Sequence, residues 1–486
     1  MQPSLRLMDR EAICRVHEGA LDILERVGVR YGSGKAEALL QEAGQKFDPR
    51  TRTVRIAPDL VQRCLALLPH EVLLAARDPR RDVVLGTGKV HACLDGQGTF
   101  TLDAATGVKR VSTLEDLVQA TRLSDALESV DYYWAPVLPG DVPDSVRTLV
   151  EAATAFTHTS RHVQHEIRSP AHVPFLLEMF DVLLGDRRRH RDRPIFSLTV
   201  CPVSPLQHEA EMTTACVDLA RCFVPIVLMP VALAGATAPV TLAGAVLQTV
   251  AEFLSGVVLY QLAQPGCPMI LGIGATILDM HTGLYAAGAP ELPLLNLALT
   301  EIGHHYGVPV MAQGVVTDAK TPGVQAGYEK MASGLTAALA GSDVINGLGL
   351  LDSHQLMCLE QLVIDDEIFR MIRRVVRGFE ADSEHLMLEL ICEVGIGGNF
   401  LGKRSTLEYL KAGEHFQPRF SHRGSYDSWL RRNHSELDTA REQVRRTLKE
   451  HEVLALPAEA ARGLREILGR ADPSMTAERL AMGSGA

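Results

Sequence analysis

The sequence predicts an α/β protein: a (β/α)8 TIM barrel with an N-terminal α+β cap and a C-terminal helical extension. Apolar stretches of strand length alternate with helical stretches between residues 131 and 402, and this alternation indicates a parallel sheet. Eight such units in about 270 residues match the usual size of a (β/α)8 barrel. The alternative is a doubly wound open sheet. It is disfavoured because no predicted strand is followed by a GxGxxG turn and because eight units are many for an open sheet.

Residues 1–130 are predicted to form the cap. Amphipathic patterns indicate helices over residues 10–27 and 35–43. Residues 71–111 then hold short β-rich stretches separated by turns such as Asp95-Gly96 and Thr106-Gly107. Short stretches joined in this way are typical of antiparallel β structure.

Residues 131–402 are predicted to form the barrel, and residues 403–486, which are charged and helical in pattern, to wrap around its outside. The eight strands are expected at residues 131–138, 161–167, 194–200, 224–233, 267–274, 308–315, 342–350 and, with the weakest pattern, 397–402. Helical stretches lie between the first seven of these strands and after the seventh, as a barrel requires.

Composition and charge exclude several classes of protein. The chain is 46% hydrophobic and 22% charged, which is typical of a globular protein, and its net charge of −11 disfavours a nucleic-acid or membrane-surface binder. Residues 223–251 carry no charge, but prolines and glycines interrupt them, so we expect a buried strand and a packed helix rather than a membrane span. The nine cysteines form no CxxC pair and the N-terminus has no apolar signal region, so we expect a cytoplasmic protein.

Candidate catalytic residues are sought just after the strands, because a parallel barrel places its reactive groups at the carboxyl ends of its strands. Gln313, Asp318 and Lys320 follow the sixth strand and form the most suggestive group. A lysine at this position suits a Schiff base, and a salt bridge with Asp318 explains it equally well. Further candidates for substrate binding follow other strands: Gln164, His165, Cys201, Gly272 and Asn346.

A metal site is not predicted. His162, His165, Glu166 and Cys201 are residues of the right type for zinc, but they lack ligand spacing. Cys201 is more often a small buried hydrophobic residue than a nucleophile, and no histidine follows it closely in the sequence.

Seven stretches, in order along nearly the whole chain, resemble the trimethylamine:corrinoid methyltransferase family. They lie at residues 16–31, 55–86, 201–212, 230–245, 314–352, 359–368 and 395–429. They include ARDPRRDVVLG, CPVSPLQHEAEM and GIGGNFLGKRSTLEYL. The resemblance extends to family members that lack pyrrolysine and act on quaternary amines such as glycine betaine.

The resemblance implies a barrel that moves a methyl group from a small methylated or quaternary amine to Co(I). The cobalamin would be carried by a separate, cognate corrinoid protein docked over the barrel mouth, with no metal bound by the barrel itself. The family also implies a homo-oligomer. Because a strongly nucleophilic cofactor carries the chemistry, the barrel has to supply position and electrostatics.

The implied substrate assigns roles to side chains. Methylated ammonium groups bind beside aromatic rings or carboxylates, and the aromatic candidates are Tyr132, Tyr133, Trp134 and Phe400. A betaine carboxylate needs hydrogen-bond donors, for which Gln164, His165, Gln313 and the backbone near Gly272 are candidates. The chain contains only the twenty standard residues, so the resemblance favours a glycine betaine-like substrate over trimethylamine.

Two other functions stay open at this point. One is a barrel lyase assisted by Lys320 or by a metal held by the histidine and cysteine residues. The other is a barrel that binds a quaternary amine or a partner protein without turning it over.

Overall fold

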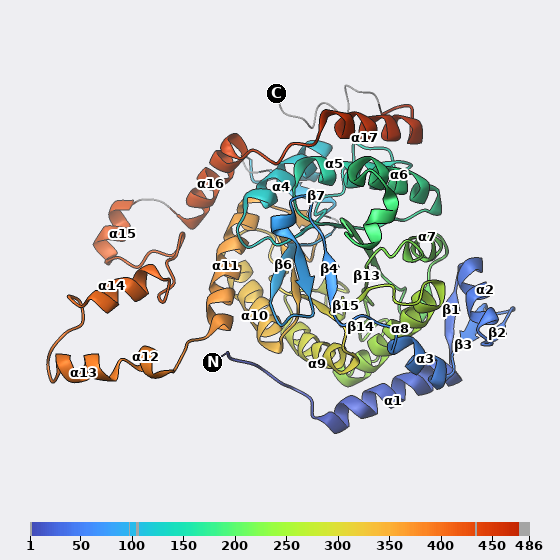
Figure 1. Ribbon diagram of the computed structural model, residues 1–486, viewed down its shortest axis with the longest axis horizontal. Coiled ribbons are helices and arrows are strands. Elements are labelled where there is room, and N and C mark those ends of the chain that lie inside the picture. The colour runs from blue at the N-terminus through green and yellow to red at the C-terminus, as the bar shows by residue number, and fades with distance from the viewer. Residues whose placement is uncertain (1, 97, 104–105, 433–434, 476–486) are drawn as a thin grey trace.

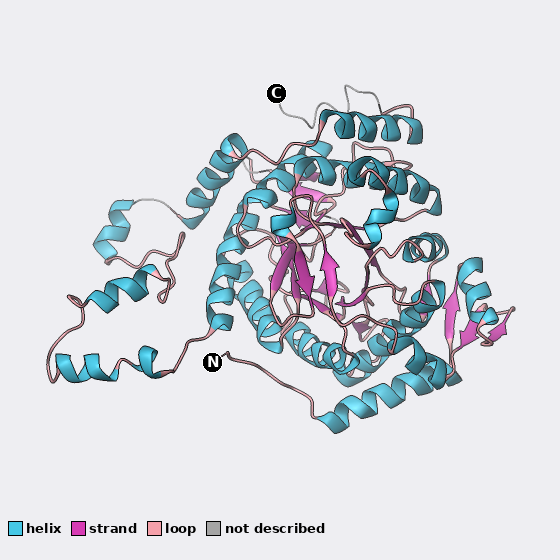
Figure 2. Ribbon diagram, in the orientation of Figure 1, coloured by secondary structure: helices cyan, strands magenta, loops and turns pink. Residues whose placement is uncertain are grey.

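Eight parallel strands surround the centre of the molecule in the computed structural model, which describes residues 2–96, 98–103, 106–432 and 435–475 (Figures 1 and 2). The neighbouring strands are, in order, β6 (His91–Leu94), β19 (Val344–Leu348), β18 (Val310–Gln313), β15 (Met269–Ile273), β13 (Ile226–Leu228), β11 (Phe196–Val200), β10 (Val163–His165) and β9 (Tyr133–Trp134). A parallel bridge between Cys93 and Tyr132 joins the two outer strands. The predicted barrel is therefore confirmed.

Helices follow the strands and form the outer layer (Figure 2). They are α4 (Leu114–Ala126), α5 (Arg147–His158), α6 (Val173–Leu184), α7 (Ala210–Ala220), α8 (Leu242–Ala263), α9 (Glu291–Tyr306), α10 (Val324–Ala340) and α11 (Leu359–Arg377). Within the described ranges, α8 alone is long and apolar enough to cross a membrane, and 78% of its most apolar window is buried inside the molecule. It packs against α1, α3, α7 and α9, as a core helix does.

One strand prediction is wrong. The first seven predicted strands are confirmed, but residues 397–402 contain no strand and are all exposed. Glycines crowd this segment, and Gly395 and Gly397 adopt positive φ angles of 63° and 75°, which belong to turns rather than to strands. The eighth position is taken by β6, whose four residues come from within segment 1–130. The division of the chain into cap, barrel and extension stays a prediction.

A hairpin fills one end of the barrel. Strands β4 (Val72–Leu74) and β5 (Val83–Leu85) pair antiparallel, and their apolar side chains join one buried cluster with Cys93, Tyr132 and other inward-facing residues. The hairpin ends are tied to residues that precede strands. The amide of Ala75 donates to the Pro194 carbonyl over 2.9 Å, and the amide of Gly86 to Asp343 Oδ1 over 2.7 Å. The hairpin therefore lies at the amino ends of the strands, and the opposite end, called the mouth below, lies at their carboxyl ends.

The N-terminal segment packs beside the barrel. The expected helices are confirmed as α1 (Arg10–Arg26) and α2 (Gly34–Glu42), and α3 (Pro58–Leu65) follows. A small sheet joins β2 (Lys46–Asp48), β3 (Thr53–Arg55), β1 (Val29–Tyr31) and β12 (Gln207–His208). Short 3₁₀ helices lie at Pro79–Arg81, Pro170–His172 and Arg187–Arg191.

Two further small sheets cover the mouth. One contains β14 (Leu233–Ala234), β16 (Thr276–Leu278) and β17 (Tyr285–Ala286). The other contains β20 (Leu350–Leu351), β21 (Leu356–Met357), β7 (Phe100–Leu102) and β8 (Lys109–Val111). Each consists of segments that follow barrel strands, so it lies where a parallel barrel places its functional loops.

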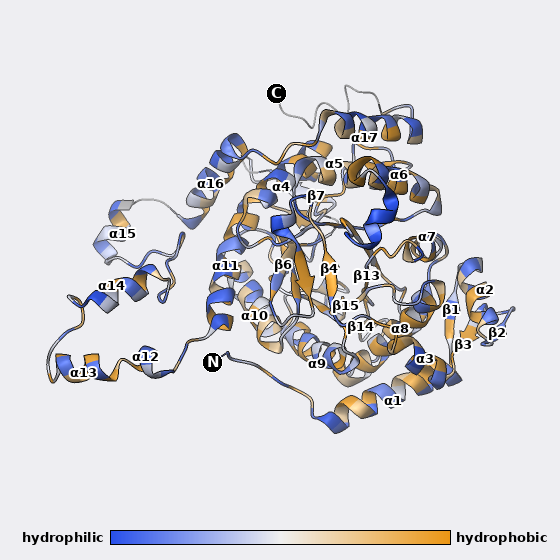
Figure 3. Ribbon diagram, viewed as in Figure 1, coloured by the Kyte–Doolittle hydropathy of each residue, from blue (hydrophilic) through white to orange (hydrophobic). Residues whose placement is uncertain are grey.

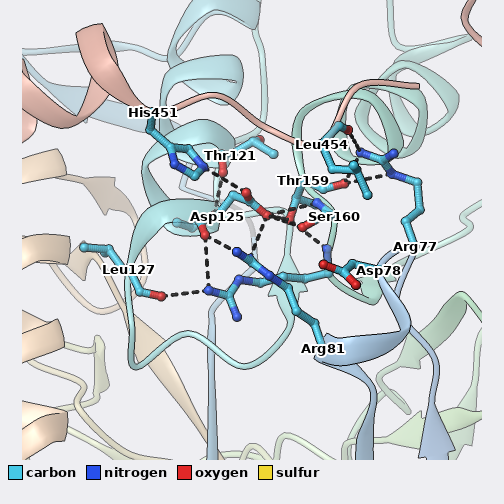
Figure 4. Close-up of polar contacts among 12 residues, drawn as sticks. Arg77, Asp78, Arg81, Thr121, Asp125, Leu127, Thr159, Ser160, His451 and Leu454 are labelled. Carbon is cyan, nitrogen blue, oxygen red and sulfur yellow. Dashed lines mark hydrogen bonds and ion pairs between the residues drawn. The ribbon is translucent and has the colours of Figure 1, made fainter. Parts of the chain in front are cut away.

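The C-terminal segment returns to the barrel after an excursion. It forms α12 (Ser383–Leu386), α13 (Leu388–Val394), α14 (Arg404–Lys411), α15 (Tyr426–Arg432), α16 (Glu436–Glu450) and α17 (Ala458–Ala471), and residues 476–486 lie outside the described residues. Helix α16 packs on α11 and α4, and α17 packs on α6. Buried Asp125 fastens this return, since its carboxylate contacts His451 Nε2 at 2.9 Å and accepts from Thr159 and Ser160 (Figure 4).

Candidate active site

Strand register brings four of the predicted residues to the barrel interior. Trp134 pairs in register with Gln164, and Gln313 pairs with Asn346. Register partners point to the same side of a sheet, and Trp134 belongs to the apolar cluster inside the barrel. All four side chains are at most 7% exposed. They lie near the carboxyl ends of their strands, where a barrel binds its substrate.

Tyr132 lies one layer deeper and forms the floor of this region. Its hydroxyl donates to Gln164 Oε1 over 3.2 Å and lies 3.7 Å from the sulfur of Met311. Burial raises the pKa of Tyr132 well above its usual range, so the phenol is neutral. The floor is therefore apolar, apart from this one hydrogen-bonded pair of side chains.

A row of polar side chains crosses the mouth above the floor. Asp95 Oδ2 lies 2.5 Å from His354 Nδ1. The His354 ring meets Tyr285 edge to face with 5.6 Å between centroids. The Tyr285 hydroxyl then donates to Gln313 Oε1 over 2.5 Å and to the Gly274 carbonyl over 3.2 Å. Asp95, His354 and Tyr285 follow β6, β19 and β15, and Gln313 is the last residue of β18, so the row ties four strand ends together.

Several buried polar atoms in this region have no hydrogen-bond partner among the described residues. They are Trp134 Nε1, Thr199 Oγ1, both amide atoms of Asn346, and His354 Nε2. Buried polar groups are nearly always hydrogen-bonded, so these atoms are available to a bound polar molecule or to water. Trp134 is held in place by Gly96, where a Cβ atom would lie only 2.6 Å from the indole ring.

The carboxylates at the mouth act on two of its neutral groups, although Glu166 also lies 3.3 Å from Arg168 Nε. Burial raises the pKa of the Cys201 thiol well above its usual range, and the charges of Glu166 and Asp95 raise it further. Burial likewise raises the pKa of Tyr285, a hydrogen bond with Gln313 opposes the rise, and Asp95 and Asp318 add to it. Cys201 is therefore a neutral thiol at physiological pH, which does not suit a nucleophile.

The two charged candidates after β18 hold loops together. Asp318 accepts hydrogen bonds from the amides of Ala287 and Gly288 over 2.8 and 2.9 Å, and from Ser353 Oγ over 2.5 Å. The Lys320 side chain is 63% exposed, and its Nζ lies 2.9 Å from Asp352 Oδ1. Neither is buried with the polar row, so we propose that both shape the mouth rather than react.

Three other candidates point elsewhere. Tyr133 faces the helix layer, where its hydroxyl lies 2.7 Å from Thr121 Oγ1, and His165 Nε2 lies 2.7 Å from Glu151 Oε2 on α5. Phe400 is 42% exposed in the segment between α13 and α14, away from the strands. Gly272, in β15, does face the barrel interior, where a Cβ atom on it would lie 2.7 Å from Met229 Cβ.

The histidine and cysteine residues considered for zinc are not gathered in one place. His162 lies near the hairpin, with Nε2 2.8 Å from Ser197 Oγ and Nδ1 3.1 Å from the Ala75 carbonyl. His165 points into the helix layer, and Cys201 borders the interior cluster. Across the described part of the chain, no group of three or more His, Cys, Asp or Glu side chains is arranged to hold a metal ion.

Sequence reasoning missed Asp95, Tyr285 and His354. Asp95 follows the short strand β6, which the sequence places in the cap, so its Asp-Gly pair resembles an ordinary turn. His354 lies in a turn whose residues Asp352, Ser353 and His354 all have positive φ angles. The one available signal is position: each of the three residues follows a barrel strand.

Buried Lys330 on α10 positions the strand ends beneath the row. Its Nζ donates to the Val315 carbonyl over 2.7 Å and to Asp365 Oδ2 over 2.8 Å, and lies 3.3 Å from the Gly347 carbonyl. Val315 lies two residues after Gln313, and Gly347 comes directly after Asn346. Lys330 therefore fixes the backbone next to two inward-facing amide side chains.

Comparisons with known proteins agree with the geometry. A family model described as trimethylamine methyltransferase (MTTB) matches residues 1–476. Trimethylamine methyltransferases MttB of Desulfitobacterium hafniense and Methanosarcina thermophila are 30% and 32% identical, covering 94% of this chain and 92% and 95% of theirs. A glycine betaine methyltransferase of Desulfitobacterium hafniense is 28% identical, covering 88% of this chain and 89% of its own.

Solved structures show the same fold. The monomethylamine methyltransferase MtmB of Methanosarcina barkeri matches with a TM-score of 0.52 at 11% identity, covering 93% of this chain and 89% of the other. At that identity the likeness concerns the fold alone. The family match, however, spans almost the whole sequence. The chain therefore belongs to the trimethylamine methyltransferase family, and it is a methyltransferase.

Proposed function

We propose that this protein demethylates a small quaternary amine of the glycine betaine type and delivers the methyl group to the reduced corrinoid of a separate carrier protein. The observation that supports this best is the mouth itself. The Asp95 carboxylate pairs there with His354, whose ring meets Tyr285, and Gly96, next to Asp95, packs against the Trp134 indole. Glu166 contributes a second carboxylate, whose charge acts on Cys201. Aromatic faces and carboxylates are the groups that recognise a methylated ammonium. The betaine-specific relative supports the substrate class.

The unpaired donors of the mouth suit the other end of a betaine. Trp134 Nε1 and Asn346 Nδ2 are buried N–H donors without a partner in the part of the chain that the structure describes. A carboxylate accepting from both would remove the cost of leaving them unsatisfied. We propose that the ammonium faces the carboxylates and rings, while the substrate carboxylate faces these donors. This polarity distinguishes a betaine from trimethylamine, which has no acceptor to offer.

In this reaction the side chains of the mouth orient the bound amine, and they transfer no proton to it. A quaternary nitrogen leaves as a neutral amine when its methyl group departs, so no acid is needed to protonate it. The reduced corrinoid of the carrier supplies the nucleophile. Tyr132 and the row from Asp95 to Gln313 hold the amine still and limit the water around it, which is how orientation accelerates a methyl transfer.

The carboxylates contribute to binding more than to chemistry. The nitrogen is positive in the bound substrate and loses that charge as the methyl group leaves. An interaction that is stronger in the ground state than in the transition state lowers KM without raising kcat. Asp95 and Glu166 are therefore expected to set KM.

The first experiment mixes the purified protein with reduced cobalamin, and separately with a reduced corrinoid protein. Glycine betaine, carnitine, proline betaine and trimethylamine are each added. The visible spectrum follows loss of the reduced corrinoid, and mass spectrometry follows the demethylated amine. Turnover of a betaine supports the proposal. Turnover of trimethylamine alone contradicts the substrate class, and failure with every amine, while a relative methylates the same corrinoid, contradicts the reaction.

Substitution of the carboxylates tests the binding role. Asp95→Asn and Glu166→Gln are each expected to raise KM for the amine about tenfold, which corresponds to about 1.4 kcal/mol of lost attraction, and to change kcat less. Asp22→Asn is the control, since Asp22 forms only an exposed ion pair with Arg26 on α1. A tenfold fall in kcat with unchanged KM would show instead that the carboxylates act in the chemical step.

A further inference from the structure

The inward side chains of the barrel form layers, and one of these layers is polar. In a (β/α)8 barrel each layer takes four residues from alternate strands, and the strand tilt shifts its level by about one residue from each strand to the next. Applied to the strand pairings, this rule places Trp134, Thr199, Gly272 and Asn346 in one layer. The pairings that connect them are Trp134 with Gln164, His165 with Leu198, Thr199 with Val227, Leu228 with Leu271, Gly272 with Met311, and Ala312 with Ile345.

This layer, called the polar layer below, lies between the apolar interior and the mouth. Beneath it, Val227 and Met311 belong to the buried apolar cluster that the β4–β5 hairpin completes. Strands β4 and β6 are coloured mainly as hydrophobic in Figure 3. Gln313 follows Ala312 by one residue, so it lies one level nearer the mouth, in the row that also contains Asp95. The polar layer is therefore the deepest level at which a polar molecule entering from the mouth meets hydrogen-bonding side chains from several strands.

The polar atoms of this layer have no partners among the residues that the structure describes. Trp134, Thr199 and Asn346 are at most 4% exposed, and the fourth position, Gly272, carries no side chain. The indole Nε1, the threonine Oγ1 and both amide atoms of Asn346 make no hydrogen bond to these residues. A buried amide that makes no hydrogen bond costs free energy. The layer is therefore complete only when a polar molecule occupies it.

The acceptor Oδ1 of Asn346 narrows the chemistry of that molecule. A primary amide has donors on one side and an acceptor on the other. Glycine betaine offers a carboxylate, which only accepts, and a quaternary ammonium, which has no N–H. It can accept from Asn346 Nδ2 but leaves Oδ1 without a donor. A hydroxyl group on the bound amine supplies the missing donor.

We propose that the substrate is a quaternary amine that carries a hydroxyl group as well as a carboxylate, and that the Asn346 amide binds both groups. Nδ2 donates to the carboxylate, and Oδ1 accepts from the hydroxyl. Trp134 Nε1 is a second donor for the carboxylate. Thr199 lies on β11, on the opposite side of the barrel from β19, where its hydroxyl meets the other side of the bound molecule. The inference rests on the proposed function and narrows its substrate class.

The arrangement also predicts the handedness of the substrate. The ammonium is held near Asp95, the hydroxyl at Asn346 Oδ1, and the carboxylate at Trp134 Nε1 and Asn346 Nδ2. A carbon atom that carries the hydroxyl between the other two groups is a stereocentre. Because three separate attachments fix its three substituents, only one enantiomer satisfies all of them. We expect the other enantiomer to bind about tenfold more weakly, as loss of one hydrogen bond implies.

The test measures binding to the purified protein by isothermal titration calorimetry, without a corrinoid. Carnitine and γ-butyrobetaine are compared because they differ only by the hydroxyl group, and the two enantiomers of carnitine are titrated separately. The preferred enantiomer of carnitine is expected to have a Kd about 100-fold lower than that of γ-butyrobetaine. A site built to bind a hydroxyl rejects the analogue that lacks it, because its own buried polar group is then left unpaired.

Substitution of Asn346 tests the assignment. Asn346→Leu keeps a similar volume and removes both the donor and the acceptor, so the Kd values of the two amines are expected to come within about threefold of each other. Both amines are measured on the same protein, so a partly unfolded variant would weaken both alike and leave their ratio unchanged. Thr249→Val is the control. Thr249 is buried on α8 and donates to the Ala245 carbonyl over 2.8 Å, so its loss should preserve the ratio.

Equal affinity for carnitine and γ-butyrobetaine would overturn the inference, because water would then serve Asn346 Oδ1. A preference for carnitine that survives Asn346→Leu would overturn the assignment to this residue. Binding of glycine betaine without binding of carnitine would overturn the inference and leave the proposed function standing. Binding of carnitine without methyl transfer to any corrinoid would contradict the proposed reaction and leave the inference standing.

Discussion

In the proposed reaction, we expect substrate recognition to depend most on Trp134. Its indole is 4% exposed, packs against Gly96, and carries a buried N–H without a partner. The face of an indole attracts an ammonium group more strongly than that of tyrosine or phenylalanine. The sequence contains only one other tryptophan, Trp429, which lies in α15.

This distribution allows binding to be measured without turnover. In the Trp429→Phe protein the fluorescence comes from Trp134, and glycine betaine is expected to shift it with a saturable dependence on concentration. Glycine, which lacks the methyl groups, is expected to shift it far less. A Trp134→Phe protein is the matched control and should show no shift. A betaine titration that leaves the Trp429→Phe spectrum unchanged would remove Trp134 from the binding site.

At the scale of single residues, the sequence places candidates at the ends of predicted strands but does not give the direction of each side chain. Tyr132, Tyr133 and Trp134 are consecutive, and alternation along β9 sends only the first and third inside. The register of neighbouring strands sets that direction, and it is a property of the assembled sheet. His354 and Tyr285 depend on loops whose path the sequence does not reveal.

Among the elements, α10 is linked to the mouth through a buried charge. Lys330 and Asp365 are both fully buried and lie 2.8 Å apart. Burial raises the pKa of Asp365, although Lys330 and other hydrogen-bond donors oppose the rise. Asp365 also accepts from the Gly349 amide over 2.8 Å. The pair thus joins α10, α11 and the backbone after β19.

Loss of either Lys330 or Asp365 is expected to lower the free energy of unfolding. Lys330→Met leaves Asp365 without its cation and two backbone carbonyls without their donor, so the free energy of unfolding should fall by about 3–5 kcal/mol. Lys330→Met combined with Asp365→Asn should lose less than the sum of the two single changes, because a charge is no longer buried alone. Urea unfolding of the four proteins measures both. Additive losses would show that the two side chains do not act as a pair.

The elements also show what patterns along the chain can predict. Strongly apolar runs such as those of β15 and β18 identify seven barrel strands, since strands buried on both faces need such runs. Strand β6 has only four residues and is followed by an Asp-Gly turn, so its sequence pattern predicts a cap strand rather than a barrel strand. The segment 397–402 has glycines in place of β-branched residues and lies between α13 and α14. Closure of a barrel is a long-range property that neither pattern reveals.

For the molecule as a whole, buried histidines determine part of the response to acid. Burial lowers the pKa of His158, His162 and His208 to about 4 and that of His190 to about 3. In the unfolded chain their pKa is near 6.5, so between these values the unfolded state binds more protons. Their contribution to stability is complete above pH 6.5 and declines as the pH falls toward 4.

One histidine provides a measurable case. His208 stacks on Tyr31 with 4.8 Å between ring centroids, and its Nε2 lies 2.8 Å from Ser255 Oγ. His208→Phe keeps the stacked ring and removes the titration. Between pH 4.5 and 6, the slope of unfolding free energy against pH should fall by about 1.4 kcal/mol per unit relative to the wild type. Equal slopes for the two proteins would mean that His208 is protonated in the fold.

The β4–β5 hairpin has a consequence for the timing of the reaction. The apolar side chains of the hairpin fill one end of the barrel, so a small amine has to enter through the mouth. A carrier docked over the mouth blocks that entrance. The order of arrival is then compulsory for the proposed reaction: the amine enters first, the carrier second, and the demethylated amine escapes only after the carrier has gone. Excess carrier should therefore slow turnover at low amine concentration, and raising the amine concentration should relieve that inhibition.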